Sequence, residues 1–340
     1  MLHFDTDYQE GCHPAILRRL TETNLDQTPG YGQDPYTLEA KRLIRQACGD
    51  DNLDVHFLVG GTQTNSTVID GLLSRHEGVL AVETAHINVH ESGAIESCGH
   101  KVLTLPSHNG KVDPSELQAY IQNFYADETY EHMVAPGMLY ISFPTELGTL
   151  YSRAELEAIH NICREANIPL FIDGARLGYG LMSDSCDLTL PQLVQLCDVF
   201  YIGGTKVGAL FGECVVARPG LLRHFFPLIK QHGALLAKGR LLGIQFATLF
   251  SDDLYFDIAR HAVEQAMRLK QGFVEKGIQL YIDSPTNQQF FVLPNELFDR
   301  LSQVATFEVW GTRGQTHTTV RFVTSWATRP EAVTELLSLL

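Results

Sequence analysis

The amino-acid sequence predicts an α/β fold, with a mostly parallel, seven-stranded β-sheet covered by helices and a small α+β domain at the carboxyl end. Seven short apolar runs, rich in β-branched and aromatic residues, are typical of buried strands. Amphipathic stretches separate most of these runs, and strands that alternate with helices favour a parallel sheet with both faces covered. Shorter strands and helices follow residue 276, which indicates a second, smaller domain.

Local sequence patterns predict the helices and turns that precede the sheet and the strands and helices of the sheet itself. The sequence predicts an irregular arm over 3–14, a helix over 14–23, a turn over 29–35 and a helix over 35–48. Pro35 suits the first helical turn, where backbone N–H groups have no helical partner. The predicted strands are 55–59, 79–83, 101–105, 138–143, 168–172, 198–202 and 213–217. The predicted helices between them are 64–74, 114–124, 153–166 and 188–197.

A long helical region with glycine breaks, 221–276, leads out of the sheet. The small domain is predicted to contain strands at 278–282, 289–293, 306–310 and 319–324, and helices at 295–303 and 330–339. We therefore divide the chain into 1–245, an amino-terminal arm plus the large domain, and 246–340, a linking helix plus the small domain.

Composition excludes several classes of partner. The 340 residues include 40 acidic and 25 basic side chains, for a net charge of −15, and no basic stripe is present. This charge argues against binding to nucleic acid or to anionic membranes. The chain starts without the charged and apolar pattern of a signal peptide, and no window reaches the ~20 apolar residues of a membrane span, so we expect a cytoplasmic protein.

The cysteines do not predict a disulfide framework. They are odd in number, scattered and never in CxxC spacing, which favours reduced thiols over disulfides or a zinc site. They are Cys12, Cys48, Cys98, Cys163, Cys186, Cys197 and Cys214.

The segment that ends the sixth predicted strand carries the main chemical signal. Ligands of parallel sheets bind beyond the carboxyl ends of the strands, and Gly203, Gly204, Thr205 and Lys206 occupy such an end. A lysine amine has an ordinary pKa of about 10.4, but in a dry pocket it can condense with an aldehyde and hold a cofactor covalently. The alternative is a surface lysine in a turn.

Three other strand ends supply groups that suit pyridoxal phosphate. Gly60–Asn65, after the first strand, opens a helix whose free N–H groups could cradle one phosphate, although a plain tight turn is the alternative. His86, after the second strand, could stack on a flat heterocycle and exchange protons, or be structural. His86 and His90 have metal-ligand spacing, but no third ligand is evident, so we predict no metal.

Asp173 ends the fifth predicted strand, where a buried carboxylate needs a positive partner such as a protonated pyridine nitrogen. Arg176 could hold a phenolic oxygen or a nearby carboxylate, and a simple salt bridge between strand ends is the alternative. Arg240 and Arg321 each interrupt an apolar stretch, and each could recognise phosphate or carboxylate or form an ordinary ion pair.

Taken in order, the motifs YGQDP, GGTQTN, ETAH, DGAR, GGTK, GR and VRFVT resemble the threonine aldolase and β-eliminating lyase family of fold-type I pyridoxal-phosphate enzymes. The resemblance covers essentially the whole chain. It implies the aspartate aminotransferase fold, a pyridoxal 5'-phosphate cofactor and a homodimer or homotetramer with active sites at the dimer interface.

The resemblance also implies roles for individual residues. Lys206 would hold the cofactor covalently and act with His86, which would stack on the ring. Asp173 would face the ring nitrogen, with Arg176 beside it. The implied phosphate ligands are Gly61, Thr62, Thr205 and, from a neighbouring subunit, Arg240. The implied substrate residues are Thr6 and Arg321 at the α-carboxylate and Tyr31 from across the dimer interface.

Two departures from the family pattern affect the expected specificity. Many threonine aldolases carry a Thr-His-Asn motif after the fourth strand, where this chain has Phe143–Leu147, so Glu146 would replace that imidazole or the substrate differs. The lysine segment is GGTKVG, not the commoner serine-lysine-glycine form.

We expect an aldol cleavage that converts a β-hydroxy-α-amino acid, of the threonine or allo-threonine type, to glycine and an aldehyde. The alternative within this fold is β-elimination or transamination. Outside it, the alternatives are a cofactor-binding regulator without turnover and a nucleotide-binding Rossmann protein.

Overall fold

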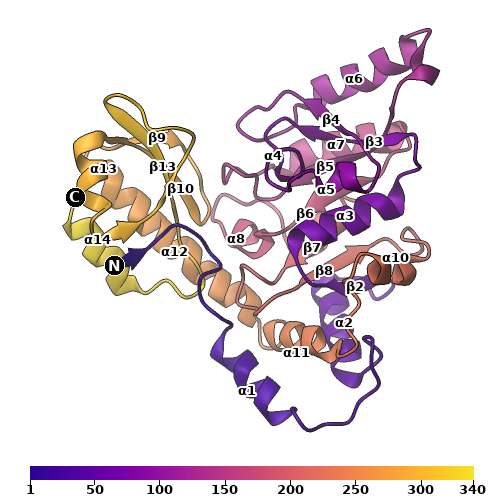
Figure 1. The fold of residues 1–340 in the computed structure, drawn as a ribbon, viewed down its shortest axis with the longest axis horizontal. Helices are drawn as coiled ribbons and strands as arrows, with labels where there is room; N and C mark the ends of the chain where they lie inside the picture. Colours follow the sequence, from indigo (N-terminus) through magenta and orange to yellow (C-terminus); the bar gives the residue numbers. More distant parts are fainter.

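The computed structural model describes residues 1–340 and consists of a large α/β domain beside a smaller domain that contains both chain termini (Figure 1). All seven predicted strands of the large domain are present, with ends within three residues of those predicted. They are β2 (Asp54–Leu58), β3 (Glu77–Val82), β4 (Val102–Leu105), β5 (Ala135–Ser142), β6 (Leu170–Asp173), β7 (Val199–Gly203) and β8 (Glu213–Ala217).

The seven strands form one sheet in the order β2-β8-β7-β6-β5-β3-β4. The pairs from β7 to β4 are parallel, and only β8 runs opposite to its two neighbours. The prediction of a mostly parallel sheet is therefore confirmed. Every residue of β6, β7 and β8 is buried, as expected for strands whose two faces are both covered.

The predicted helices that connect the strands are present, and shorter ones were missed. Three of the predicted helices are long, α3 (Gly61–Leu72), α6 (Pro114–Ala126) and α7 (Arg153–Glu165), whereas the one predicted over 188–197 is reduced to α9 (Leu190–Val194). Short helices too brief for an apolar period to reveal are α4 (His86–Val89), α5 (Ala94–Ser97), α8 (Leu177–Leu181) and a 3₁₀ turn, η1 (Tyr130–His132). α7 begins with a capping box in which Ser152 and Glu155 satisfy each other's backbone N–H groups.

The amino-terminal helices α1 (Pro14–Glu22) and α2 (Pro35–Cys48) also match prediction. The Asp34 side chain accepts the Thr37 N–H and so caps α2, which ends at Gly49 in the left-handed conformation. The glycine-broken region 221–276 contains three helices, α10 (Phe225–Gln231), α11 (Arg240–Leu249) and α12 (Leu254–Glu275).

The small domain is an antiparallel sheet of order β12-β13-β10-β9 with two helices. Its elements are β9 (Gln279–Ile282), β10 (Gln288–Pro294), α13 (Asn295–Leu301), β12 (Glu308–Val309), β13 (His317–Val323) and α14 (Pro330–Ser338). The predicted strand 306–310 is divided, because β11 (Ala305–Thr306) leaves this sheet and pairs with β1 (Leu2–His3). Backbone pairing therefore ties the start of the arm, Leu2 to Phe4, to the small domain, and the rest of the arm as far as His13 is irregular, as expected.

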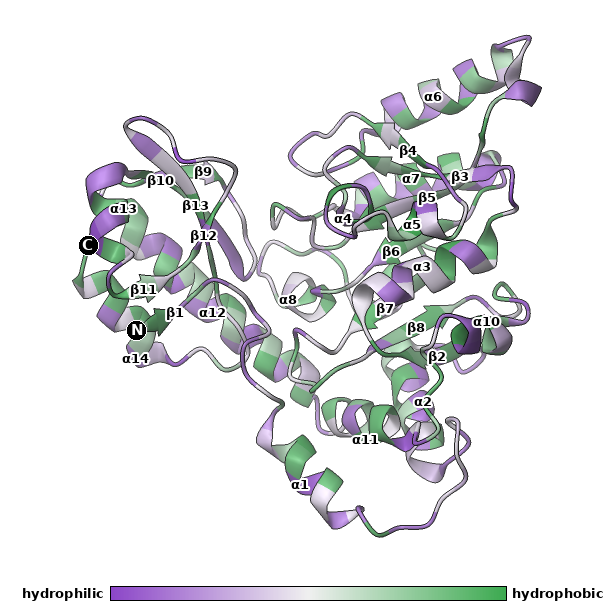
Figure 2. Ribbon diagram, viewed as in Figure 1, coloured by the Kyte–Doolittle hydropathy of each residue, from purple (hydrophilic) through white to green (hydrophobic).

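Each domain has its own hydrophobic core, formed by residues of its strands and helices, and α12 contributes to both cores. Figure 2 shows the hydrophobic colouring concentrated along the central strands and mixed along the surrounding helices. Ile258 and Ala262, in the first half of α12, belong to the core of the large domain, whereas Leu269 and Phe273 pack in the small core with Phe4. The boundary at 245/246 stays a prediction. No helix of the structure is long and apolar enough to span a bilayer.

Gly148 makes a close contact between the two domains. It has a φ of 71°, and its carbonyl oxygen accepts hydrogen bonds from Ser284 Oγ at 3.2 Å and Thr286 Oγ1 at 3.1 Å. A Cβ at this position would lie 2.2 Å from Ser284 Oγ. Glycine is therefore required here both for its backbone conformation and for space.

We expect Gly148→Ala to lower the free energy of unfolding by about 2–4 kcal/mol, since it adds a steric clash to left-handed backbone strain. Gly277→Ala is the matched control, because Gly277 has a φ of 75° but no atom within 4 Å of its added Cβ. Gly277→Ala should lower the free energy of unfolding by about 1–2 kcal/mol, because it adds backbone strain without a steric clash. Urea denaturation measures both, and equal losses would contradict the close contact.

Candidate active site

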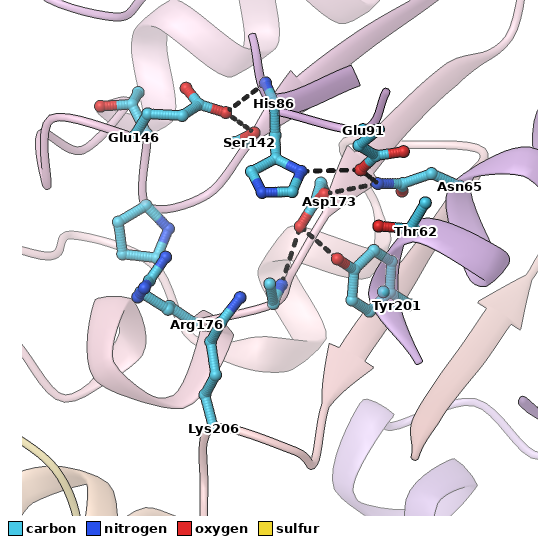
Figure 3. A pocket seen from close by; sticks show the side chains of 14 residues that line it. Thr62, Asn65, His86, Glu91, Ser142, Glu146, Asp173, Arg176, Tyr201 and Lys206 are labelled. Carbon is cyan, nitrogen blue, oxygen red and sulfur yellow. Dashed lines mark hydrogen bonds and ion pairs between the residues drawn. The ribbon is translucent and has the colours of Figure 1, made fainter. Parts of the chain in front are cut away.

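A polar pocket opens beyond the carboxyl ends of the parallel strands (Figure 3). It contains about 570 Å³ of space free of atoms, and only two of its 14 lining residues are hydrophobic. Seven of the residues expected from the sequence line it together, as predicted for groups at neighbouring strand ends. They are Gly61, Thr62, His86, Glu146, Asp173, Arg176 and Lys206.

Lys206 lies three residues beyond β7, is half-buried and lines the pocket. Burial lowers the pKa of its amine, and the nearby Arg176 guanidinium lowers that pKa further. A larger share of the amine is therefore unprotonated at neutral pH than in a solvated lysine. Tyr179 fixes the backbone here by donating its hydroxyl proton to the Lys206 carbonyl oxygen at 2.5 Å.

Asp173 receives four hydrogen bonds. The hydroxyls of Tyr140 on β5 and Tyr201 on β7 each donate to its carboxylate at 2.5 Å. Asn65 Nδ2 and the Ala175 N–H complete the set at 3.0 and 2.9 Å. Burial raises the pKa of Asp173, but the groups around it, with the two phenols first among them, together hold that pKa below its ordinary value, so the carboxylate stays charged.

Glu146 and His86 are neighbours and lie across the pocket from Lys206 (Figure 3). Glu146 Oε1 accepts the backbone N–H of His86 at 3.0 Å and the Ser142 hydroxyl at 2.6 Å. Burial raises the pKa of Glu146. The chain thus places a carboxyl group beside the His86 backbone, within the loop where the family resemblance leads us to expect an imidazole.

Arg176 is paired with a residue that the sequence analysis missed. Its Nε and Nη2 donate to the two oxygens of Asp7 at 2.7 and 3.0 Å, and Asn287 Nδ2 donates to the same carboxylate at 2.9 Å. The expected Thr6 is not among the residues that line the pocket. The carboxylate that Arg176 was expected to hold is thus supplied by the amino-terminal arm.

The predicted phosphate cradle lies at the start of α3. Gly60 is extended, with a φ of −165°, and α3 begins at Gly61 with no side-chain cap, so first-turn N–H groups have no helical partner. Gly61 and Thr62 line the pocket. The Thr205 hydroxyl lies outside the pocket lining and accepts the Gly212 N–H at 3.0 Å.

Three further residues that were expected at the site do not line the pocket of their own chain. Arg321, on β13, donates to Gln288 Oε1 at 2.7 Å, forms an ion pair with Glu308 and has a buried Nε without a hydrogen-bond partner. Tyr31 is 45% exposed and lies under the Lys230 amine. Arg240 donates to the carbonyl oxygens of Asp26 and Asn24.

The sequence analysis also missed the residues that hold Asp173. Tyr140 and Tyr201 lie inside predicted strands, where they resemble ordinary core residues. A usable signal was present, because a buried tyrosine hydroxyl needs a hydrogen-bond partner. His86 and His90 have ring centroids 5.8 Å apart, and the structure has no group of three or more His, Cys, Asp or Glu side chains arranged to hold a metal ion.

Several known proteins are similar to this chain over nearly its whole length. The family model described as "Beta-eliminating lyase" matches residues 4–295. The chain is 31% identical to the low specificity L-threonine aldolase of Pseudomonas aeruginosa, over 98% of this chain and 95% of that protein. A solved structure of a threonine aldolase from Leishmania major is 40% identical, with a TM-score of 0.96, and the match covers 100% of this chain and 98% of that one.

The fold is shared more widely. A solved aspartate aminotransferase of Thermus thermophilus has a TM-score of 0.75 at 14% identity, over 100% of this chain and 90% of that one. At this identity the likeness shows the fold alone. The expected aspartate-aminotransferase-like architecture, fold type I, is thereby confirmed.

Proposed function

Because the chain belongs to the beta-eliminating lyase family, we propose that it is a pyridoxal-phosphate-dependent carbon–carbon lyase of the threonine aldolase type. Its reaction would cleave a β-hydroxy-α-amino acid to glycine and an aldehyde. The observation that carries this proposal is that a half-buried lysine with a lowered pKa and a charged, buried aspartate face one pocket.

The residues of the pocket fit pyridoxal phosphate. Asp173 is charged and buried, yet no lysine, arginine or histidine forms an ion pair with it. A buried carboxylate in this state is costly, and a protonated pyridine nitrogen would supply the missing positive charge. Lys206 would hold the cofactor covalently, and the start of α3 at Gly61 and Thr62 would bind its phosphate. Thr205 is proposed as a further phosphate ligand.

The cofactor, when bound, supplies an electron sink for the charge left on Cα as the Cα–Cβ bond breaks. Arg321 and Thr6 would hold the substrate carboxylate. To do so, the Arg321 guanidinium would leave its ion pair with Glu308 and form one with the substrate carboxylate. His86 would take the β-hydroxyl proton, directly or through a water that it positions. Glu146, whose carboxyl group lies on the same side of the pocket, would contact the β-hydroxyl or the group beyond it.

We also propose that the protein is a homodimer or a homotetramer. Its support is that Tyr31 and Arg240, which the family resemblance assigns to the site, lie outside the pocket of their own chain. In an oligomer, each would reach the pocket of a second copy. Size-exclusion chromatography with light scattering tests this, and a monomer with full activity would contradict it.

The function is tested by measuring aldehyde release from L-threonine and L-allo-threonine with purified, cofactor-loaded protein. Release that requires Lys206 would support the aldolase. Absence of aldehyde, in a protein whose cofactor spectrum responds to amino acids, would contradict it. An assay for ketoacid would then test for elimination or transamination.

We expect Asp173→Asn to lower kcat/KM by about 10²-fold and to weaken cofactor retention during dialysis, since a neutral amide stabilises a protonated pyridine poorly. Asp198→Asn is the matched control. Asp198 precedes the opposite end of β7 and forms an ion pair with Arg218 at 2.8 Å, away from the pocket. The control should keep its cofactor, and equal loss in both variants would indicate a structural effect.

A further inference from the structure

Glu91 lies between α4 and α5 and lines the pocket beside the His86 ring (Figure 3). Its side chain is fully buried, whereas the imidazole of His86 is 38% exposed. Glu91 Oε1 lies 2.7 Å from His86 Nδ1, a hydrogen-bond distance. One nitrogen of the imidazole is therefore held by a buried carboxyl group, and Nε2 is left for other partners.

The contacts of Asn65 indicate whether the proton between Glu91 and His86 lies on the carboxyl group or on the imidazole. Its Nδ2 lies 2.7 Å from Glu91 Oε1 and 3.0 Å from Asp173 Oδ2. Only the nitrogen of an amide can donate to two carboxylates, so the orientation of Asn65 is fixed. Glu91 Oε1 accepts this N–H, and we assign the proton in its contact with His86 to Nδ1, so that Oε1 accepts both hydrogen bonds.

We propose that Glu91 is a positioning residue that holds His86 in the Nδ1–H tautomer, so that the Nε2 lone pair is free to accept a proton. This inference rests on the proposed function for the identity of that proton, the one on the substrate β-hydroxyl. When Nε2 accepts it, the ring becomes a cation and forms an ion pair with Glu91. The proton returns from Nε2 to solvent or product, so the residue is unchanged after each turnover.

The surroundings of His86 favour this arrangement. The groups that face the ring besides Glu91 are His90, with a centroid distance of 5.8 Å, and the charged Asp173. Glu146 is bound to the His86 backbone N–H, so it does not compete for Nδ1. Glu91 Oε2 has no hydrogen-bond partner in the buried interior, which leaves His86 and Asn65 as the only hydrogen-bond partners of this carboxylate.

The tautomer can be read directly by nitrogen NMR of histidine-labelled holoprotein at about pH 9, where an imidazole is neutral. His86→Gln identifies the signals by their loss. We expect the wild-type ring to carry its proton on Nδ1. In Glu91→Ala it should move largely to Nε2, whereas Glu91→Gln should retain Nδ1–H because its amide oxygen can still accept. A wild-type ring protonated on Nε2 would overturn the proposal.

Kinetics give a second readout. Glu91→Ala should lower kcat by about 10²-fold with a smaller change in KM, and Glu91→Gln should recover part of that loss. The control is Glu116→Ala, which removes a surface pair with His108 at 3.0 Å and should alter neither the His86 signals nor kcat. The tautomer is read without substrate, so a protein that releases no aldehyde would refute the proposed function without changing the test of Glu91.

Discussion

Lys206→Ala is expected to abolish aldehyde release, with a loss of at least about 10⁴-fold, and to prevent covalent attachment of the cofactor. No other lysine lines the pocket, so no neighbouring amine can take its place. Borohydride reduction of the cofactor-loaded protein, followed by peptide mass spectrometry, should find the modification on Lys206 in the wild type and nowhere in the variant.

Lys101→Ala is a suitable control, because Lys101 is exposed and lies before β4 at the other end of the sheet from the pocket. It should retain both the modification and the activity. Reduction that labels a different lysine in the wild type would contradict the assignment. Activity in Lys206→Ala would refute the covalent role of Lys206.

The largest effect on stability is expected for Asp7→Ala, about 3–5 kcal/mol in the free energy of unfolding. Asp7 is fully buried, and the side chain of Arg176 is only 14% exposed, so the variant leaves a guanidinium without a counter-charge in the interior. It also removes the acceptor of Asn287 Nδ2. Denaturation in urea measures the loss.

Asp5→Ala provides the matched control from the same arm. Asp5 is partly exposed and accepts the Thr306 hydroxyl, so its replacement should cost about 1 kcal/mol or less. The double variant Asp7→Leu/Arg176→Met removes both charges and should recover much of the stability lost in Asp7→Ala. Equal losses in the two single variants would show that the buried ion pair contributes little.

The same pair gives stability a defined dependence on pH. Burial raises the pKa of Asp7, but Arg176, Lys206 and Asn287 together outweigh burial and hold that pKa below its ordinary value. A carboxyl group with a depressed pKa stabilises the fold fully above its unfolded pKa of about 3.9 and loses that contribution as pH falls through the folded pKa. The stability difference between wild type and Asp7→Ala should therefore be constant near neutrality and shrink below about pH 4.

The sequence was sufficient to predict the sheet because each strand is a continuous apolar run between turns. It was also sufficient to place Asp173 and Lys206 at one edge, since parallel strands bring their carboxyl ends together. Periodicity did not reveal α4 or α8, which have only four and five residues. It could not divide the segment 306–310, because the division depends on pairing with β1, about 300 residues away in the chain.

The choice between Thr6 and Asp7 shows why contacts of the arm were harder to predict. The arm has no helical or strand period from which to infer a facing side, so adjacent polar residues are equivalent in the sequence. Their directions follow from the pairing of β1 with β11 and from the Phe4 carbonyl oxygen, which accepts the Val323 N–H at 2.7 Å. The roles proposed for Tyr31 and Arg240 depend on a second chain, whose placement no local pattern specifies.

The pairing of β1 with β11 also constrains how the protein can form on the ribosome. Leu2 and Phe4 belong to the hydrophobic core of the small domain, together with Leu293, Ala305 and Phe322. At about 5–20 residues per second of synthesis, the first residues wait about 15–60 s before β11 is made. During that time these apolar side chains lack their partners and Asp7 lacks Asn287, so the arm cannot take its final position before the small domain has been made.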